Sequence, residues 1–365
     1  MNAADRLATL LSVAGLLGAC ASTPAPPPPA SAAAAPALTS ADPLAEVSLP
    51  ALPLWTDKYA DPDAGSPRYL DIDAVMARHG LTRWQAVEVQ NHYRDQADVG
   101  APGGPEAWYA EAVRRVRAGD YESGYDAERI GSAPFVVVFD LDETLYDQRV
   151  RAEAGCHDLV ATQPSGKRRR IKLVPGWQDA LARLHALGGA VVLFSANLDA
   201  PTLANLTAWT WGGVPIRDRP EIAAVMTNSY LIMQSKAAGD PISRPSKDLR
   251  LFDESLSKVI IVDNMPLRIF HHANTRRFHE FQADERCGAD PAMAAAIDGA
   301  LPEVVREVED SLAWMKAHGG TFAEAYRPFT MLGQDVVRVL VDGGLSEAEA
   351  VTYVREHPES VRDAF

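Results

Sequence analysis

The sequence has few cysteines and little positive charge. Three cysteines occur in 365 residues, at positions 20, 156 and 287, without a C-x-x-C pair, so neither a zinc ribbon nor a disulfide-dense scaffold is indicated. The net charge of −14 argues against nucleic acid as the main partner, because phosphate backbones are bound by basic faces. The sequence leaves open whether Cys156 and Cys287 pair or are free.

The apolar stretch near the N-terminus, residues 7–17, is too short to span a bilayer and has the length of a signal-peptide core. It leads into "LGAC", which resembles a bacterial lipobox, the motif in which the cysteine is lipidated and becomes the first residue of the mature chain. We therefore predict a lipoprotein signal peptide at 1–19 and lipidation at Cys20. An ordinary cleaved signal is the alternative.

Residues 20–50 are rich in proline and alanine and carry almost no charge. Such a segment cannot bury a core, and we predict an extended, semi-rigid tether. Acyl chains on Cys20 would hold the protein on a membrane without a spanning helix. The expected location is the bacterial cell envelope, with a lipid anchor in the outer membrane and the rest of the chain facing the periplasm.

The full sequence is 47% hydrophobic and long enough to bury a large core. Helical patterns dominate residues 51–130, where Thr82 and Gln85 have capping-box spacing, and residues 289–365, where an amphipathic helix is predicted over 302–318. Neither segment contains a catalytic constellation. We expect both to pack against a central domain.

Residues 131–288 alternate between apolar runs of strand length and helical patterns. This alternation predicts a three-layer α/β/α, Rossmann-like parallel sheet with flanking N- and C-terminal helical segments. Ligands bind beyond the carboxyl ends of the strands in such sheets. The predicted strands are 135–139, 190–194 and 258–262, and the predicted helices are 177–187 and 200–211, the latter with Asp199 as its cap and Gly212 and Gly213 as its stop.

Polar side chains follow each of the three predicted strands, and a lysine stands just before the third. Parallel strands end at one edge of a sheet, so these groups are expected to converge on one crevice. They are Asp140 and Asp142, Ser195 and Asn197, Asp263 and Asn264, and Lys247.

The two aspartates after the first strand suit phosphoryl transfer. A carboxylate attacks phosphorus when the charge of its target is neutralised, so Asp140 is the predicted nucleophile, forming an aspartyl-phosphate. Asp142 would protonate the leaving alcohol and then take a proton from water, which requires the two pKa values to differ. Lys247 would neutralise the phosphoryl oxygens.

Oxygen-rich ligands favour a hard cation, and Mg²⁺ fits a site with few carboxylates beside a phosphate. The hydroxyls of Ser195 and Thr144 are expected to position the phosphoryl group and the loop, respectively. For Glu143 a structural role, bonding nearby backbone, is favoured over a catalytic one. The predicted Mg²⁺ ligands are Asp140, the main-chain carbonyl of Asp142, Asp263 and Asn264.

Four segments together resemble the motifs of the haloacid dehalogenase (HAD) superfamily: "VVVFDLDETLY", "VVLFSAN", "SKDL" and "VIIVDNMP". Over about 135–285 the sequence is most similar to the NLI-interacting-factor-like family, which includes the small phosphatases of the RNA polymerase II C-terminal domain. "KRRRIKLVPGWQDALARL" and "KDLRLFDESLSKVIIVDNMPLRIFHHAN" carry that similarity. The resemblance implies a HAD fold, Mg²⁺ and phosphatase activity.

Two departures from that family lie near the expected substrate. Val174 stands where the family commonly has arginine, and "SAN" replaces the usual "TAS", so the eukaryotic phosphoprotein specificity is not carried over. The lipoprotein class C acid phosphatases, which share "DLDET" and a membrane anchor, are the second resemblance.

The leading expectation is a Mg²⁺-dependent phosphatase that acts on a phosphorylated small molecule or a phosphoprotein. A nonspecific class C-like phosphatase, a catalytically silent scaffold of the same fold, and a phosphotransferase or mutase are the alternatives. Two segments bear on the substrate: residues 212–244, a possible lid or insert, and the basic run at 166–172. The basic run is either a solvated hairpin tip or a rim that attracts an anionic substrate.

Overall fold

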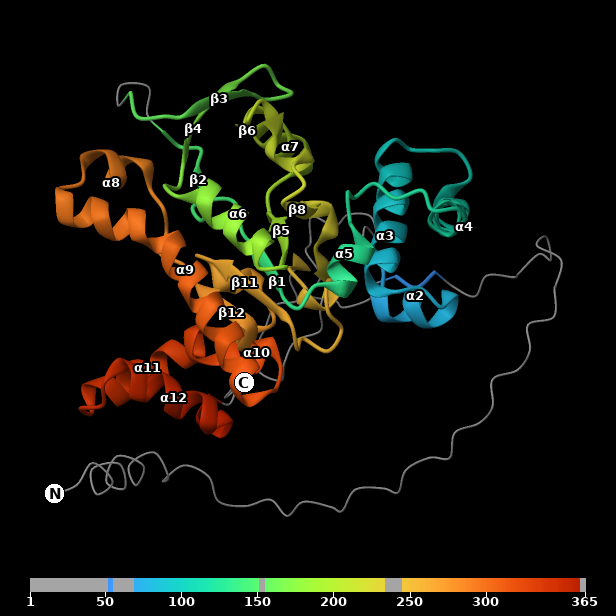
Figure 1. The fold of residues 1–365 in the computed structure, drawn as a ribbon. Coiled ribbons are helices and arrows are strands. Elements are labelled where there is room, and N and C mark those ends of the chain that lie inside the picture. The colour runs from blue at the N-terminus through green and yellow to red at the C-terminus, as the bar shows by residue number, and fades with distance from the viewer. Residues whose placement is uncertain (1–51, 55–68, 151–154, 234–244, 362–365) are drawn as a thin grey trace, which may run out of the picture.

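The computed structural model describes residues 52–54, 69–150, 155–233 and 245–361, in which helices surround a central sheet (Figure 1). The predicted signal peptide, Cys20 and the tether lie outside these residues. Within them, no helix is long and apolar enough to cross a membrane.

The central sheet has five parallel strands in the order β12–β11–β1–β5–β8. Their continuous apolar runs suit strands that are covered on both faces. Strand β1 lies in the middle, with Val138 opposite Val192 on one side and Ile261 on the other. The three predicted strands are confirmed, and the two edge strands were not predicted. The bounds are β1 Val136–Phe139, β5 Ala190–Phe194, β8 Ile222–Met226, β11 Val259–Asp263 and β12 Thr275–Arg277.

Alternate side chains of β1 enter two separate cores. Val136 and Val138 share one with helices α2 (Ile72–His79), α3 (Arg83–Asp98), α4 (Gly104–Arg117) and α5 (Ala127–Ser132). Val137 and Phe139 share the other with α6 (Trp177–Ala186), α9 (Pro291–His318) and α10 (Phe322–Tyr326). Figure 1 shows these helix groups on opposite sides of the sheet. The predicted three-layer α/β/α fold is confirmed.

The N-terminal helices form one of the two outer layers. Val87, Val89 and Tyr93 of α3 are fully buried in the same core as β1. The capping box predicted at the start of α3 is present, with the main-chain N–H of Thr82 donating to Gln85 Oε1 across 3.0 Å. These helices therefore support the sheet directly.

The helix predicted over 200–211 has different bounds. Helix α7 runs from Asp199 to Ala208, and residues 210–211 instead form β6 (Thr210–Trp211), which pairs with β7 (Val214–Pro215). The two glycines between them, Gly212 and Gly213, have φ of 60° and 82° and make a hairpin turn rather than a helix stop. Asp199 is the first residue of the helix and Leu198 is the cap; the Asp199 carboxylate instead accepts from the N–H of Ser229.

The helix predicted to begin at Pro302 begins eleven residues earlier, at Pro291. Asp290 caps it by accepting from the N–H groups of Ala292 and Met293, each at 2.9 Å. Proline is favoured in the first turn of a helix, and here that position belongs to Pro291 while Pro302 lies inside. Two further helices follow, α11 (Met331–Asp342) and α12 (Glu347–Glu356).

The segment proposed as a lid, 212–244, is in part a core element. Strand β8 at 222–226 is the sheet edge beside β5, and most of its side chains are buried. The same segment ends in β9 (Ile232–Met233), which pairs with β10 (Pro245–Ser246) across residues outside the described part. The lid interpretation is therefore wrong for residues 222–226, which the apolar run "IAAVM" places in the sheet.

The basic run at 166–172 lies mainly in a strand. Strand β4 (Arg168–Leu173) pairs with β3 (Leu159–Thr162) on one side and with β2 (Tyr146–Asp147) on the other. Only Gly166 and Lys167 belong to the hairpin turn. Ile171 is buried between its charged neighbours, because alternate side chains of a strand point to opposite faces.

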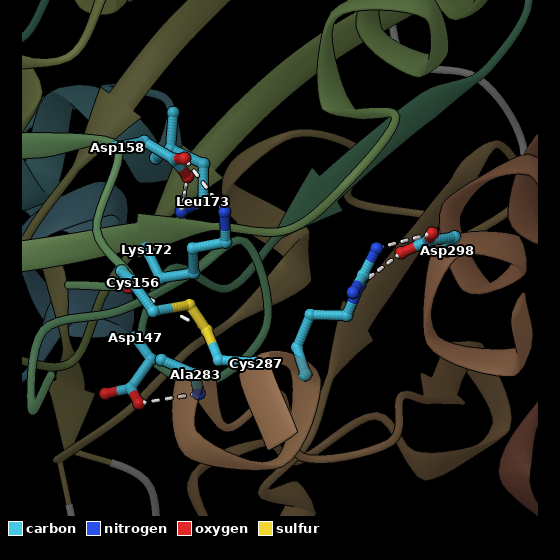
Figure 2. Close-up of a disulfide and its surroundings, with 9 residues drawn as sticks. Asp147, Cys156, Asp158, Lys172, Leu173, Ala283, Cys287 and Asp298 are labelled. Atoms are coloured by element: carbon cyan, nitrogen blue, oxygen red, sulfur yellow. Dashed lines mark hydrogen bonds and ion pairs between the residues drawn. A yellow bond between two sulfur atoms is a disulfide. The ribbon is translucent and has the colours of Figure 1, made fainter. Parts of the chain in front are cut away.

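Cys156 and Cys287 form a disulfide, with their Cα atoms 6.2 Å apart (Figure 2). It joins the segment before β3 to helix α8 (Ala283–Gly288). The N-terminus of the same helix is held by Asp147, whose carboxylate accepts from the N–H of Ala283 at 2.9 Å. The region after β1 is thus tied to α8 at two points.

Candidate active site

Three strands of the central sheet end beside one cavity of about 240 Å³. Asp140 directly follows β1, Asn197 lies in the loop after β5, and Asp263 is the last residue of β11. The convergence of polar groups expected at the carboxyl ends of these strands is therefore present. The cavity is lined by Asp140, Asp142, Glu143, Asp147, Gln148, Arg149, Ala196, Asn197, Lys247, Asp263, Asn264, Met265 and Arg268.

Lys247 bridges two of the strand ends. Its Nζ atom lies 2.5 Å from Asp140 Oδ1 and 2.7 Å from Asp263 Oδ2, and its side chain is almost fully buried. The main-chain N–H of Lys247 donates to the carbonyl of Arg268 at 2.8 Å, which fixes the backbone from which the side chain enters. An ammonium buried this deeply requires charged partners, and the two aspartates supply them.

Asp142 is held by a different set of groups. Ser195 Oγ donates to Asp142 Oδ2 at 3.0 Å, and Gln148 Nε2 donates to Oδ1 at 2.6 Å. The Ser195 hydroxyl oxygen itself accepts from the N–H of Asn197 at 3.0 Å. Ser195 is fully buried and is not among the lining residues, so it lies behind Asp142, whereas Asn197 reaches the cavity.

Thr144 connects the loop after β1 to the end of β11. Its hydroxyl lies 3.3 Å from both Asp140 Oδ2 and Asn264 Oδ1, and it accepts from the N–H of Asn264 at 3.3 Å. The side chain is completely buried. Thr144 therefore sits where it can hold the loop in place.

Glu143 has a positive φ of 60°, a conformation uncommon for residues other than glycine. Its N–H donates to the carbonyl of Tyr146 and its carbonyl accepts from the N–H of Phe281, both at 2.7 Å. The bonds to nearby backbone are thus made by its main chain. Its carboxylate instead pairs with Arg149 at 2.5 Å beside the cavity.

Burial raises the pKa of both catalytic candidates. The pKa of Asp140 is raised to about 8, chiefly by burial; Lys247 opposes this rise, and repulsion from Asp263 and Asp142 adds to it. Burial also raises the pKa of Asp142, against the hydrogen bonds from Ser195 and Asn197. Burial lowers the pKa of Lys247, but Asp140 and Asp263 outweigh this and raise it. The cluster of Asp140, Asp142, Asp263 and Lys247 therefore has more acidic groups than its one ammonium can neutralise.

A divalent cation fits this deficit. Two carboxylates, from Asp140 and Asp263, contact a single buried ammonium, and the neighbouring side chain of Asn264 offers an amide oxygen. All of these donors are oxygen atoms, the ligand type that Mg²⁺ prefers. Asp140, Asp263, Asn264 and the carbonyl of Asp142 are the groups that would hold it.

Several cavity residues were not predicted. Gln148 contacts Asp142 directly, and the guanidinium groups of Arg149 and Arg268 add positive charge to a largely acidic wall. The two arginines could have been predicted from the sequence, because an anionic substrate requires positively charged side chains in addition to Lys247. Gln148 follows a strand of only two residues, which gives no periodic signal from which to place it.

Comparisons with known proteins identify the class of this domain. Residues 135–287 match the family of NLI interacting factor-like phosphatases. The match identifies residues 135–287 as a phosphatase domain of the type that this family describes, which is a haloacid dehalogenase type. No curated protein matches the chain.

Two solved structures of an RNA polymerase II CTD phosphatase, Fcp1, show weak similarity. One is an arginine-to-alanine variant of the fission yeast enzyme bound to beryllium fluoride, with 13% identity over 64% of this chain and 68% of that one and a TM-score of 0.29. The other is described as essential and has 13% identity over 64% of each chain and a TM-score of 0.30. Similarity at this level transfers neither site geometry nor substrate.

Proposed function

We propose that the protein is a Mg²⁺-dependent phosphomonoesterase that acts through an aspartyl-phosphate on Asp140. The observation that carries this proposal is the double contact of Lys247 Nζ, at 2.5 Å from Asp140 and 2.7 Å from Asp263, while Asp142 is held separately by Ser195. The buried carboxylate of Asp140 and the half-buried carboxylate of Asp142, two residues apart, thereby have different partners. Nucleophilic and acid–base roles require such a difference.

In the first step, a carboxylate oxygen of Asp140 attacks phosphorus, the bond from phosphorus to the ester oxygen breaks, and Asp142 donates a proton to the leaving oxygen. The burial that raises the pKa of Asp142 supports a protonated starting state. In the second step, Asp142 takes a proton from water as the water oxygen attacks phosphorus. Inorganic phosphate leaves and Asp140 is regenerated.

Lys247 stays beside Asp140 through both steps and offsets the charge on the phosphoryl oxygens. Mg²⁺, when bound by the oxygen ligands named above, would supply further neutralisation of carboxylate and phosphoryl charge. Arg149 and Arg268 at the cavity wall favour an anionic substrate. The substrate class is a phosphomonoester, carried by a small molecule or by a protein.

We also propose that the enzyme is lipid-anchored at Cys20 in the bacterial cell envelope. The apolar stretch at 7–17 followed by "LGAC" supports the anchor. The Cys156–Cys287 disulfide supports a location outside the cytosol, since disulfides persist in oxidising compartments. Mass spectrometry of the membrane fraction tests the anchor, and a wild-type chain that retains residues 1–19 or an unmodified Cys20 would contradict it.

The activity is tested by hydrolysis of p-nitrophenyl phosphate by the full-length protein, with Mg²⁺ and with EDTA. Turnover is expected only with Mg²⁺ and is expected to vanish in Asp140→Asn. Asp335→Asn, which changes an exposed carboxylate paired with Arg338, is the matched control. A folded protein that neither turns over substrate nor binds beryllofluoride with Mg²⁺ would be a silent binding module.

A further inference from the structure

A second cluster of ligand-type side chains lies in the N-terminal helical layer. His92 and Asp95 are three residues apart on α3 and so share one face of the helix. Glu122 approaches them from the segment between α4 and α5, and one ligand atom from each of the three residues lies within 4.8 Å of the others. None of the three lines the active-site cavity.

Among the described residues, one nitrogen of the His92 ring makes no aligned hydrogen bond and lies beside the carboxylate of Glu122. Its Nε2 lies 2.8 Å from the main-chain carbonyl of Asp120, and since a carbonyl only accepts, Nε2 carries the proton. In the neutral ring, Nδ1 is then an unprotonated lone pair. It is buried, has no aligned partner among the described residues, and lies 2.9 Å from Glu122 Oε1.

A lone pair facing a carboxylate oxygen is repulsive unless a positive charge lies between them, and Asp95 adds a second carboxylate. Either a proton on Nδ1 or a metal ion satisfies this arrangement. The contact from Nε2 to the Asp120 carbonyl is the outer contact that metal-bound histidines typically make, because it fixes both the tautomer and the ring plane.

The segment that presents Glu122 is positioned without help from the cluster. The fully buried carboxylate of Glu88 accepts from the N–H of Glu122 at 3.0 Å and from the N–H of Ser123 at 3.1 Å. Arg115 Nε donates to the side chain of Asp120 at 2.7 Å, which holds the residue whose carbonyl orients His92. The three ligand groups are therefore brought together by the fold itself.

We propose that His92 Nδ1 and the carboxylates of Asp95 and Glu122 bind a divalent transition-metal ion of the Zn²⁺ class. One neutral imidazole and two carboxylates together carry two negative charges, which balance the charge of a divalent cation. Because this set includes a nitrogen ligand, it suits Zn²⁺ better than the active-site ligands do, which are all oxygen atoms. Asp95 and Glu122 are exposed, so water has access to complete the coordination. The ion ties α3 to the segment after α4.

The test uses the full-length protein after removal of metals with a chelator. Zn²⁺ is titrated calorimetrically with Mg²⁺ in large excess, and Co²⁺ is titrated separately by its visible absorption. Glu122→Gln and Asp95→Asn keep the side-chain shape at exposed positions and remove the ligand charge. Each is expected to reduce the number of bound Zn²⁺ ions by one, or to weaken that site by at least about 100-fold. Glu309→Gln, a carboxylate that pairs with Arg183 on another helix, is the control and should bind as the wild type does.

His92→Gln alters a buried residue and can fail to fold, so nuclear magnetic resonance of the wild-type His92 ring provides an independent measurement. Zn²⁺ is expected to shift Nδ1 selectively, while Nε2 keeps its proton. Equal Zn²⁺ binding by the wild type, Glu122→Gln and Asp95→Asn would overturn the proposal. So would a His92 ring that is protonated on Nδ1 and unaffected by Zn²⁺, which would assign the cluster to an ordinary ion pair.

Discussion

Ser195 donates its hydroxyl hydrogen to Asp142 across 3.0 Å, from a fully buried position at the end of β5. The same hydroxyl oxygen accepts from the N–H of Asn197, so the direction of its hydrogen is fixed. The orientation of Asp142 therefore depends on the register between β1 and β5. This contact makes Ser195 a positioning residue for the proposed general acid.

Replacing Ser195 with alanine should lower kcat by about 10- to 100-fold, because Asp142 loses the buried hydroxyl that orients Oδ2 and keeps its contacts with Gln148 and Asn197. KM should change little, since Ser195 does not line the cavity. The measurement is steady-state hydrolysis of p-nitrophenyl phosphate, with Ser255→Ala, which alters an exposed hydroxyl bonded to Asp253, as the control. A wild-type kcat in Ser195→Ala would refute the positioning role.

Replacing Asp142 with asparagine should depend on the leaving group. Alkyl phosphates leave as poor alkoxides and need the proton, so their turnover should fall by about 10²- to 10⁴-fold. Phosphorylation of Asp140 by p-nitrophenyl phosphate should fall much less, because p-nitrophenolate leaves without a proton. Burst kinetics with both substrates measure the first step separately. Equal losses for the two leaving groups would contradict the acid role of Asp142.

The strand ends of the site were predictable because their signals are local. Apolar β-branched runs give β1, β5 and β11, and parallel strands bring the residues that follow them to one edge. The edge strand β8 was missed because "IAAVM" lies in the segment interpreted as a lid, behind a hairpin whose glycines suggested a helix stop. The start of α9 was missed because two prolines are eleven residues apart and either suits a first turn.

The contacts within the site were less predictable than its members. Ser195 was predicted to position the phosphoryl group, and its hydroxyl is directed at Asp142, a direction that no pattern in the sequence indicates. The pairing of Cys156 with Cys287 spans 131 residues and follows only from tertiary structure. Long-range contacts of this kind depend on how the layers pack.

Asp248, next to Lys247, should make stability depend on pH. Its fully buried carboxylate lies 2.9 Å from His271 Nε2 and 2.6 Å from Arg250 Nη2. Burial favours a raised pKa, but these hydrogen bonds outweigh it and hold the pKa of Asp248 well below its usual range. A carboxyl pKa that is lower in the folded state stabilises the fold above the unfolded value of about 3.9, and this stabilisation is lost as the pH falls below it.

The variant Asp248→Asn should therefore lower the free energy of unfolding by about 1.5–3 kcal/mol at pH 7, because its amide replaces a carboxylate that accepts charge-assisted hydrogen bonds from Arg250. The difference from the wild type should shrink as the pH falls below about 4. Urea unfolding of both proteins at a series of pH values measures this difference in the free energy of unfolding. Asp335→Asn, at an exposed ion pair, should change the free energy of unfolding by no more than about 0.5 kcal/mol at any pH. A pH-independent difference for Asp248→Asn would refute the linkage.

The disulfide should stabilise the fold without being required for it. Cys156 and Cys287 are separated by 131 positions in the sequence, and breaking the bond should lower the free energy of unfolding by about 2–4 kcal/mol. The domain should still fold, because α8 keeps the contact from Asp147 to Ala283 and the pair between Arg286 and Asp298, both drawn in Figure 2. Urea unfolding of Cys156→Ser measures the loss, and Cys20→Ser, which keeps the disulfide, should match the wild type. A reductant should lower the urea midpoint of the wild type and leave that of Cys156→Ser unchanged. If it lowers both midpoints equally, the stabilisation does not come from this disulfide.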